Sequence, residues 1–220
     1  MPTRQKDIAV FGIGAFGEAM ALQLYKLGNN VLAVDHDPKI VERIKDDVTE
    51  AIVADVTDED VISELSVAKF DLIILTMGND LESLILCTTH LKNAKAKKIM
   101  AKVNSAIQKQ ILASVGADEV IEPEKEFAEL LAKKITAPNI MEIVPFDNGF
   151  LATVAIPARM YGKTLQELDL RHKYKISAIL IKKNNDEAGI IWDPSIKLET
   201  GDELTVIGME DNITAVFGEK

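Results

Sequence analysis

The stretch IAVFGIGAFG, residues 8–17, carries the strongest structural signal in this chain of 220 residues. Four apolar residues precede glycines at positions 12, 14 and 17, and the segment that follows places Phe16, Met20 and Leu24 on one helical face. A carboxylate, that of Asp35, appears about twenty residues further on. A strand, a G-x-G-x-x-G turn and a helix in this order predict a Rossmann-type nucleotide-binding unit.

Each glycine of this turn has its own physical role. Gly12 permits a tight turn, Gly14 lets the backbone approach a phosphate, and Gly17 lets the helix pack closely on the strand. The N–H groups at the start of the helix have no partner within the helix, so they attract an anion together with the helix dipole. The predicted phosphate contacts are Gly12, Ile13, Gly14, Ala15, Phe16 and Gly17.

Asp35 ends the second predicted strand, where a carboxylate accepts hydrogen bonds from ribose hydroxyls. The same carboxylate would repel a 2′-phosphate, which disfavours NADP. His36 follows directly and is expected beside the ribose. The alternative is that the glycines only shape a turn and that Asp35 caps the next helix.

The alternation of strands and helices continues to residue 122. Further predicted strands lie at residues 31–35, 51–54, 72–76, 99–102 and 119–122. Apolar strands separated by segments of helix length predict an α/β fold with a doubly wound parallel sheet. Because ligands of such sheets bind at the carboxyl ends of the strands, further contacts are expected there, with ordinary loop or cap chemistry as the alternative. These residues are Asp55, Val56, Met77, Gly78, Asn79 and Lys102.

The pattern changes after the predicted sheet is complete. A helix over residues 125–136 carries an apolar stripe, and the following stretch, residues 139–147, is too apolar for a flexible linker. We expect this stretch to be buried against the next domain or a second subunit. The expected organisation is a nucleotide-binding domain with its crossover helix over residues 1–137, an apolar linker over 138–148 and a small α+β domain over 149–220.

Composition excludes several classes of function. The net charge is −10 and the isoelectric point is near 4.9, so nucleic acid is not an expected partner. Cys87 is the only cysteine, which fits a reducing compartment. The sequence shows no signal-peptide pattern and no apolar run long enough to span a membrane. No spacing of nucleophilic, basic and acidic residues indicates a catalytic set or a metal site.

Several segments resemble the TrkA/KtrA family of RCK proteins, the regulators of potassium conductance. Besides the glycine-rich turn with Asp35, they are VAD at residues 53–55, AKVN at 101–104, VGADEVIEPEK at 115–125, LQELDLRHKY at 165–174 and LETGDEL at 198–204. The resemblance covers essentially the whole chain. The segments at 115–125 and 165–174 are much more specific than the glycine motif.

The resemblance implies a cytosolic gating subunit of a bacterial potassium uptake system, peripheral on the inner face of the cell membrane. Such subunits form dimers that assemble into an octameric ring beneath a membrane-embedded potassium transporter subunit. ATP and ADP would bind the first domain and favour different ring shapes. Cyclic di-AMP would bind the second domain at a dimer interface and inhibit uptake.

The resemblance also assigns roles to single residues. Glu124 falls on a carboxylate that helps to hold a cation, such as a divalent cation, near the nucleotide phosphates across a subunit interface. Asp169 and Arg171 fall in the cyclic di-AMP region, and Arg171 has a surface or interface ion pair as its alternative role. The nucleotide contacts that the resemblance implies are Gly12, Gly14, Gly17, Asp35 and Lys102.

Two features depart from the family pattern. ATP-responsive members carry an arginine at the position of Ala15, so the choice between ATP/ADP and NAD/NADH stays open. Ser177 and Ala178 are smaller than the residues expected in the cyclic di-AMP pocket. A nucleotide-sensing gating subunit is the leading hypothesis, with a small NAD-dependent oxidoreductase and a scaffold that holds nucleotide only for stability as alternatives.

Overall fold

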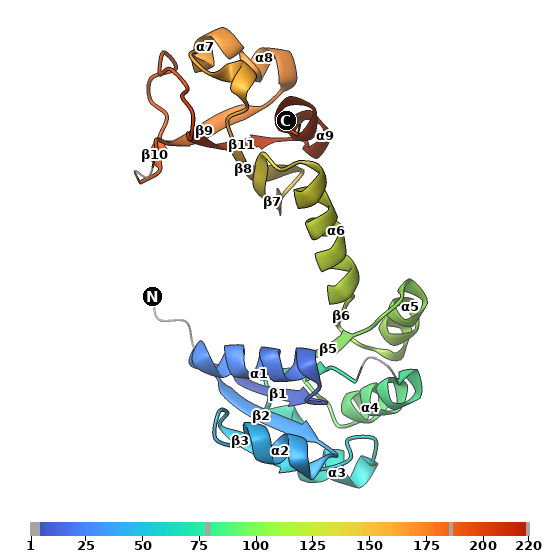
Figure 1. The fold of residues 1–220 in the computed structure, drawn as a ribbon. Helices are drawn as coiled ribbons and strands as arrows, with labels where there is room; N and C mark the ends of the chain where they lie inside the picture. The colour runs from blue at the N-terminus through green and yellow to red at the C-terminus, as the bar shows by residue number, and fades with distance from the viewer. Residues whose placement is uncertain (1–4, 78–79, 185–186, 219–220) are drawn as a thin grey trace. The chain divides into compact units, whose positions relative to one another are not determined.

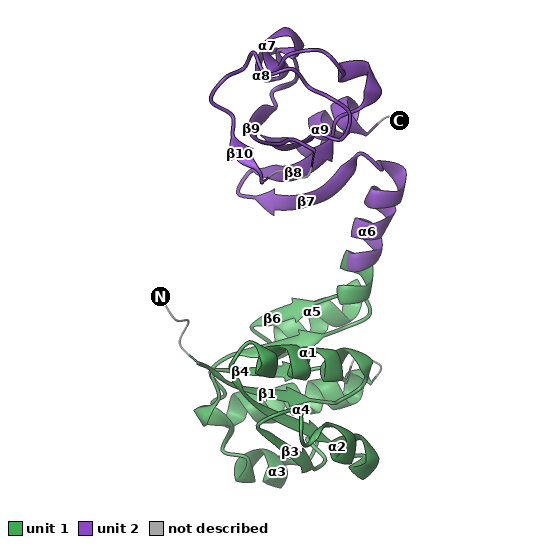
Figure 2. Ribbon diagram, turned by 60° about the vertical axis from the view of Figure 1, so that its left-hand side comes forward, with its two compact units in different colours: residues 1–126 green, residues 127–220 purple. Residues whose placement is uncertain are grey.

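The structure, a computed structural model, describes residues 5–77, 80–184 and 187–218. The chain divides into two compact units, Met1–Glu126 and Phe127–Lys220 (Figure 2). The first unit contains a parallel sheet and the second a separate antiparallel sheet (Figure 1). Each unit therefore buries its own apolar residues, the first unit in two clusters and the second unit in one.

The first sheet has the strand order β3-β2-β1-β4-β5-β6, which is a common order of the doubly wound parallel sheet that the sequence predicts. Its strands are β1 (Asp7–Phe11), β2 (Asn30–Asp35), β3 (Glu50–Val53), β4 (Leu72–Leu75), β5 (Ile99–Lys102) and β6 (Glu119–Ile121). The connecting helices are α1 (Ala15–Lys26), α2 (Pro38–Ile44), α3 (Glu59–Glu64), the 3-10 helix η1 (Val67–Lys69), α4 (Leu81–Asn93) and α5 (Ala106–Val115). The predicted fold class is confirmed.

Different helices cover the two faces of this sheet. Alternate residues of a strand point to opposite faces, so Ala9 and Phe11 of β1 join a core with α3, α4 and α5. Ile8 and Val10 join a second core with α1 and α2. Burial on both faces explains why the strands read as continuous apolar runs. It also leaves the carboxyl edge of the sheet, where strands lead into helices, as the place for a ligand.

Cys87 lies on α4 in the first of these cores and is fully buried. Burial raises the pKa of its thiol to about 12, and the reactive form of a cysteine is the thiolate. We expect iodoacetamide at about pH 8 to leave Cys87 unmodified in the folded protein and to alkylate it fully in denaturant. Intact mass spectrometry distinguishes the two states. Rapid alkylation without denaturant would contradict the burial of this side chain.

The second sheet is antiparallel, with the order β10-β9-β11-β8-β7. Its strands are β7 (Ile140–Phe146), β8 (Gly149–Ala155), β9 (Ser177–Lys182), β10 (Gly189–Ile190) and β11 (Glu203–Gly208). The helices of this part are α6 (Pro123–Thr136), the 3-10 helix η2 (Ala158–Met160), α7 (Leu165–Leu168), α8 (Leu170–Tyr174) and α9 (Glu210–Phe217). Helix α6 begins in the first unit and continues into the second. The core of the second unit forms where α9 packs on β8.

Strand β7 differs from the sequence expectation for residues 138–148. This stretch is expected as an apolar linker that is buried against the next domain or a second subunit, but most of it is an outer strand that pairs along its length with β8. Ile140 is buried and Ile143 half-buried, while the other β7 side chains, including Pro145, are exposed in the single chain. Apolar residues therefore occupy both faces of β7. The alternating pattern that identifies a half-buried strand is absent for this reason.

Candidate functional site

The glycine-rich turn joins β1 to α1 as predicted. Gly12 has a φ of +87°, and a Cβ at this position would lie 2.6 Å from Cγ of Met77. A Cβ on Gly17 would lie 2.1 Å from the carbonyl oxygen of Gly12. At Gly14, in contrast, an added Cβ would meet no atom within 4 Å. The turn therefore requires glycine at two positions for its own packing and leaves open space at the third.

The open space at Gly14 lies at the N-terminus of α1. Gly14 is the residue before the first turn of this helix, and no described side chain caps it. Its carbonyl oxygen accepts the first helical hydrogen bond, from the N–H of Glu18 at 2.8 Å. The free N–H groups of the first turn need an acceptor from elsewhere. A phosphate group supplies such an acceptor with the charge that the helix dipole favours.

Asp35 connects the end of β2 to this turn. Its side chain is 6% exposed, Oδ2 accepts the N–H of Ile13 at 2.6 Å, and Oδ1 accepts the N–H of Asp37 at 2.9 Å. His36 lies beside it, with Nδ1 3.3 Å from Oδ1 of Asp35 and a side chain that is 83% exposed. Each carboxylate oxygen keeps a lone pair for a ribose hydroxyl. Asp37, rather than Asp35, caps α2 through the N–H of Lys39, so the alternative role of Asp35 as a helix cap is wrong.

A cavity of about 500 Å³, which we name the Asp35 pocket, lies at the carboxyl ends of β1 to β4. Predicted residues in its lining are Gly12, Gly14, Asp35, His36, Asp55, Val56 and Met77. Asp55 accepts hydrogen bonds from the hydroxyl and the N–H of Thr57, which lower the pKa of the Asp55 carboxyl. The other two predicted residues of this edge, Gly78 and Asn79, lie outside the described residues.

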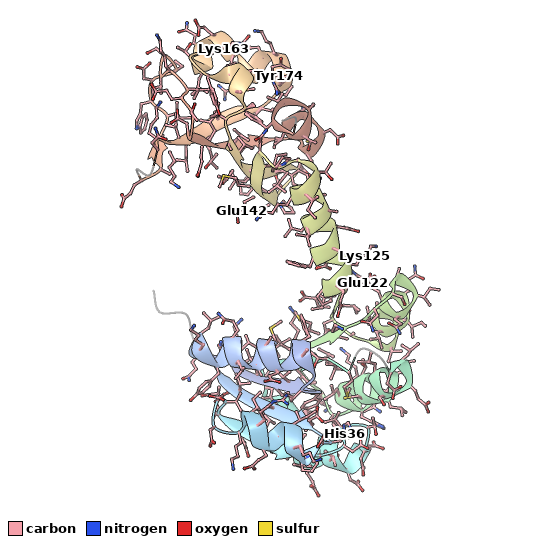
Figure 3. The ribbon with its side chains drawn as sticks, in the orientation of Figure 1. His36, Glu122, Lys125, Glu142, Lys163 and Tyr174 are labelled. Carbon is pink, nitrogen blue, oxygen red and sulfur yellow. The ribbon has the colours of Figure 1, made fainter. Side chains whose placement is uncertain are left out.

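An adjoining cavity of about 490 Å³, the Lys102 pocket, shares Gly14 and Thr76 with the first. Its remaining lining residues are Ala15, Phe16, Lys102, Val103, Asn104, Glu122, Glu124 and Lys125. Figure 3 labels Glu122 and Lys125 where β6 leads into α6. The two cavities meet at the open start of α1. This arrangement suits a ligand with phosphates at the turn and further groups on both sides.

Lys102 is held by three neighbours in the second cavity. Its side chain is only 10% exposed, and Nζ lies 2.6 Å from Oε1 of Glu124. Nζ also donates to Oδ1 of Asn104 at 3.1 Å and lies 5.9 Å from the centre of the Phe16 ring. The hydrogen bond from Lys102 lowers the pKa of Glu124, whose side chain is 63% exposed.

Several lining residues of the two pockets are not among the predicted site residues; in the Lys102 pocket they include the polar side chains of Asn104, Glu122 and Lys125. Asn104 comes two residues after β5, and Glu122 directly follows β6. The rule that ligands bind at the carboxyl ends of strands, which identified Lys102, could have found both. Lys125 lies inside α6, so that rule does not reach it; it ends the family-like segment at 115–125, but no role in the site was assigned to it.

Two further sites were predicted, a cation site at Glu124 and a cyclic di-AMP site at Asp169 and Arg171, and the single chain gathers few of the groups that either would need. Among the described residues, no group of three or more histidine, cysteine or acidic side chains could hold a metal ion at Glu124 or elsewhere. Asp169 lies between α7 and α8, and its carboxylate contacts Nδ1 of His172 at 2.6 Å, which lowers the pKa of Asp169. Arg171 is exposed on α8. Neither residue lines the nearby cavity of about 670 Å³ beside η2.

A doubly wound sheet with this turn and a carboxylate at the end of β2 define a Rossmann-type domain, which is followed here by a small α+β domain. Residues 8–123 match the family model of the TrkA-N domain and residues 150–218 that of the TrkA-C domain. The chain belongs to the TrkA/KtrA family, which confirms the resemblance seen in the sequence.

The similarity to individual proteins extends over nearly the whole chain. Ktr system potassium uptake protein A from Vibrio alginolyticus is 34% identical over 214 residues, which cover 97% of each chain. Ktr system potassium uptake protein C from Bacillus subtilis is 30% identical over 213 residues, covering 96% of this chain and 95% of that one.

A solved structure shows the same fold. The GsuK channel bound to NAD superposes with a TM-score of 0.67 at 16% identity, covering 98% of this chain and 40% of that chain. The present chain thus spans less than half of the length of that channel. Within the described residues, no helix has the length and apolar character needed to cross a membrane.

Proposed function

We propose that this protein is a regulatory subunit of a potassium uptake system and senses a nucleotide through its first domain. The main support for this proposal is the similarity to Ktr potassium uptake proteins over almost the full length of the chain. The membrane-embedded potassium transporter subunit would be a separate chain, with the present protein bound at its cytoplasmic face. The protein acts as a binding module rather than as an enzyme.

The proposed ligand is an adenine nucleotide, either ATP/ADP or NAD/NADH. The ribose hydroxyls would bind Asp35, and the phosphates would lie at Gly14 against the start of α1. The rest of the ligand would enter the Lys102 pocket, where Lys102 provides positive charge that Ala15 does not. The GsuK channel, which shares the fold, has been solved bound to NAD.

The exposed stripe of α6 supports self-association. Phe127, Leu130, Leu131 and Ile135 are exposed in the single chain. An amphipathic helix whose apolar side faces water marks an interaction surface. We propose that a second copy covers this stripe in a dimer and that dimers assemble into an octameric ring. Cyclic di-AMP binding near Asp169 and Arg171 of the second domain belongs to the same proposal.

Thermal unfolding with separate additions of ATP, ADP, NAD and NADH tests the nucleotide site. A ligand that binds only the native state raises the melting temperature. Gly14→Val should abolish this shift, because its side chain fills the space where the phosphate would lie. Without ligand, Gly14→Val should cost about 1 kcal/mol or less, since its Cβ meets open space.

Two results would contradict the proposal. One is a wild-type melting temperature that no nucleotide changes at about 1 mM, a concentration that detects weak binding. The other is turnover of NADH with a carbonyl substrate by the purified protein, which would favour an oxidoreductase.

A further inference from the structure

The second domain has a cavity of its own, of about 670 Å³, which we name the Lys163 pocket. Its lining comes from two segments, residues 159–163 at and after η2 and residues 167–174 of α7 and α8. Figure 3 labels Lys163 from the first segment and Tyr174 from the second. The volume is that of a site for a small molecule, and both segments belong to the second compact unit. A single chain therefore completes this pocket.

The Lys163 pocket carries an excess of positive charge, although the whole chain has a net charge of −10. Its described lining contains the cations Arg159, Lys163 and Lys173 and the carboxylate Glu167. Oε2 of Glu167 accepts the N–H of Thr164 at 2.8 Å, and this hydrogen bond lowers the pKa of Glu167. No described carboxylate lies within ion-pair distance of the ammonium of Lys163 or Lys173. An anion that binds here relieves the repulsion between these like charges.

The cavities of the first domain do not share this excess of positive charge. The described lining of the Asp35 pocket contains three aspartates and neither lysine nor arginine. In the Lys102 pocket, two lysines are matched by two glutamates. A phosphate group therefore meets a larger excess of positive side-chain charge in the Lys163 pocket than in either of these cavities.

Backbone hydrogen bonds hold the rim of the Lys163 pocket in place. The N–H of Gly162 donates to the carbonyl oxygen of Leu198 at 2.8 Å, and the N–H of Leu198 donates to that of Lys163 at 2.9 Å. The guanidinium of Arg159 donates to the carbonyl oxygen of Val216 at the end of α9. A ligand would find this part of the pocket formed in advance, which reduces the entropy lost on binding.

The pocket also offers apolar and aromatic surface. Met160 and Leu170 are buried, Leu168 is half-buried, and Tyr161 and Tyr174 are exposed in the single chain. The face of a tyrosine ring packs well against another flat ring, while arginine and lysine bind phosphate oxygens. A bare inorganic anion would use only the cations. A ring that carries a phosphate group would use both kinds of surface.

We propose that the Lys163 pocket binds a phosphomonoester that carries one flat ring. The phosphate would lie at Arg159, Lys163 and Lys173, and the ring against Tyr161 and Tyr174. This site is separate from the nucleotide site of the first domain, so the inference does not depend on the proposed function. It also differs from the cyclic di-AMP proposal, because neither residue assigned to that ligand lines the pocket.

Fluorine NMR of 4-fluorophenyl phosphate, titrated with the full chain, tests the site. The titration is made in a Gly14→Val background, which blocks the proposed phosphate position in the first domain. We expect a dissociation constant on the order of 1 mM, since the ligand is small. 4-Fluorophenol, which lacks the phosphate, should bind at least about tenfold more weakly, because it cannot use the cations.

Two matched pairs of variants locate the bound molecule. Lys173→Gln should weaken binding by about three- to fivefold, the size of an exposed charge contact. Lys175→Gln removes the same charge two residues later, outside the lining, and should leave the affinity unchanged. Tyr174→Leu should weaken binding of 4-fluorophenyl phosphate by about threefold or more, but should not change the competition by inorganic phosphate.

Several results would overturn this inference. One is a fluorine signal that the protein does not change at about 10 mM ligand, far above the expected dissociation constant. Another is equal weakening by Lys173→Gln and Lys175→Gln, which would indicate attraction by general charge. Inorganic phosphate that binds as tightly as 4-fluorophenyl phosphate would show a site for a bare anion. Binding lost in Arg171→Gln but kept in Lys173→Gln would place the molecule in the region proposed for cyclic di-AMP.

Discussion

Gly17→Ala is expected to lower the free energy of unfolding of the first domain by about 3 kcal/mol and to abolish nucleotide binding. The added Cβ would lie 2.1 Å from the Gly12 carbonyl oxygen and 2.6 Å from Oγ1 of Thr76. Neither group can move easily, because the Thr76 hydroxyl, a single donor, lies within hydrogen-bond distance of the carbonyl oxygens of both Phe11 and Gly12. Helix α1 would have to shift away from β1. Urea unfolding followed by circular dichroism measures the loss.

Gly14→Ala is the matched control for this prediction. It makes the same chemical change three residues earlier, but the new Cβ meets open space. We expect a change in unfolding free energy below about 1 kcal/mol. If Gly14→Ala and Gly17→Ala lowered the free energy of unfolding by similar amounts, the close contact at Gly17 would not be the cause of the destabilisation.

Asp35→Ala is expected to weaken nucleotide binding by about 100-fold or more and to destabilise the first domain by about 2 kcal/mol. The binding loss follows from the missing acceptor for the ribose hydroxyls. The stability loss follows because the buried carboxylate accepts two backbone hydrogen bonds, from Ile13 and Asp37. Calorimetry and urea unfolding measure the two effects separately.

Asp37→Ala provides the comparison for Asp35→Ala. It removes the cap of α2 and should cost about 1 kcal/mol, with much less effect on binding. A folded Asp35→Ala protein with wild-type affinity would assign Asp35 a structural role alone.

Most of the first domain could be predicted from the sequence, because its strands are buried on both faces and its helices have clear ends. Helix α2 starts with Pro38, directly after its cap Asp37. Helix α5 begins after Ser105, which caps it, and ends at Gly116 in the left-handed conformation. Local signals of this kind do not depend on distant contacts.

The parts that escaped prediction depend on contacts between distant residues. Strand β7 could not be recognised as a strand from the sequence, because it exposes apolar side chains. Its pattern therefore does not distinguish a buried face from a solvent face. In the site, the sequence indicated Lys102 and Glu124 separately. It did not show that they contact each other, since a strand and a helix separate them along the chain. Three-dimensional pairing of long side chains leaves no local pattern.

Strand β7 forms one edge of the second sheet, and an edge strand can pair with a strand of another molecule. An edge strand with exposed apolar residues presents a row of unpaired backbone groups that another chain can extend into an aggregate. Pro145 stands within β7 and has no N–H to offer, so it interrupts that row. A proline in an edge strand opposes aggregation through that edge, and this effect matters most at high protein concentration.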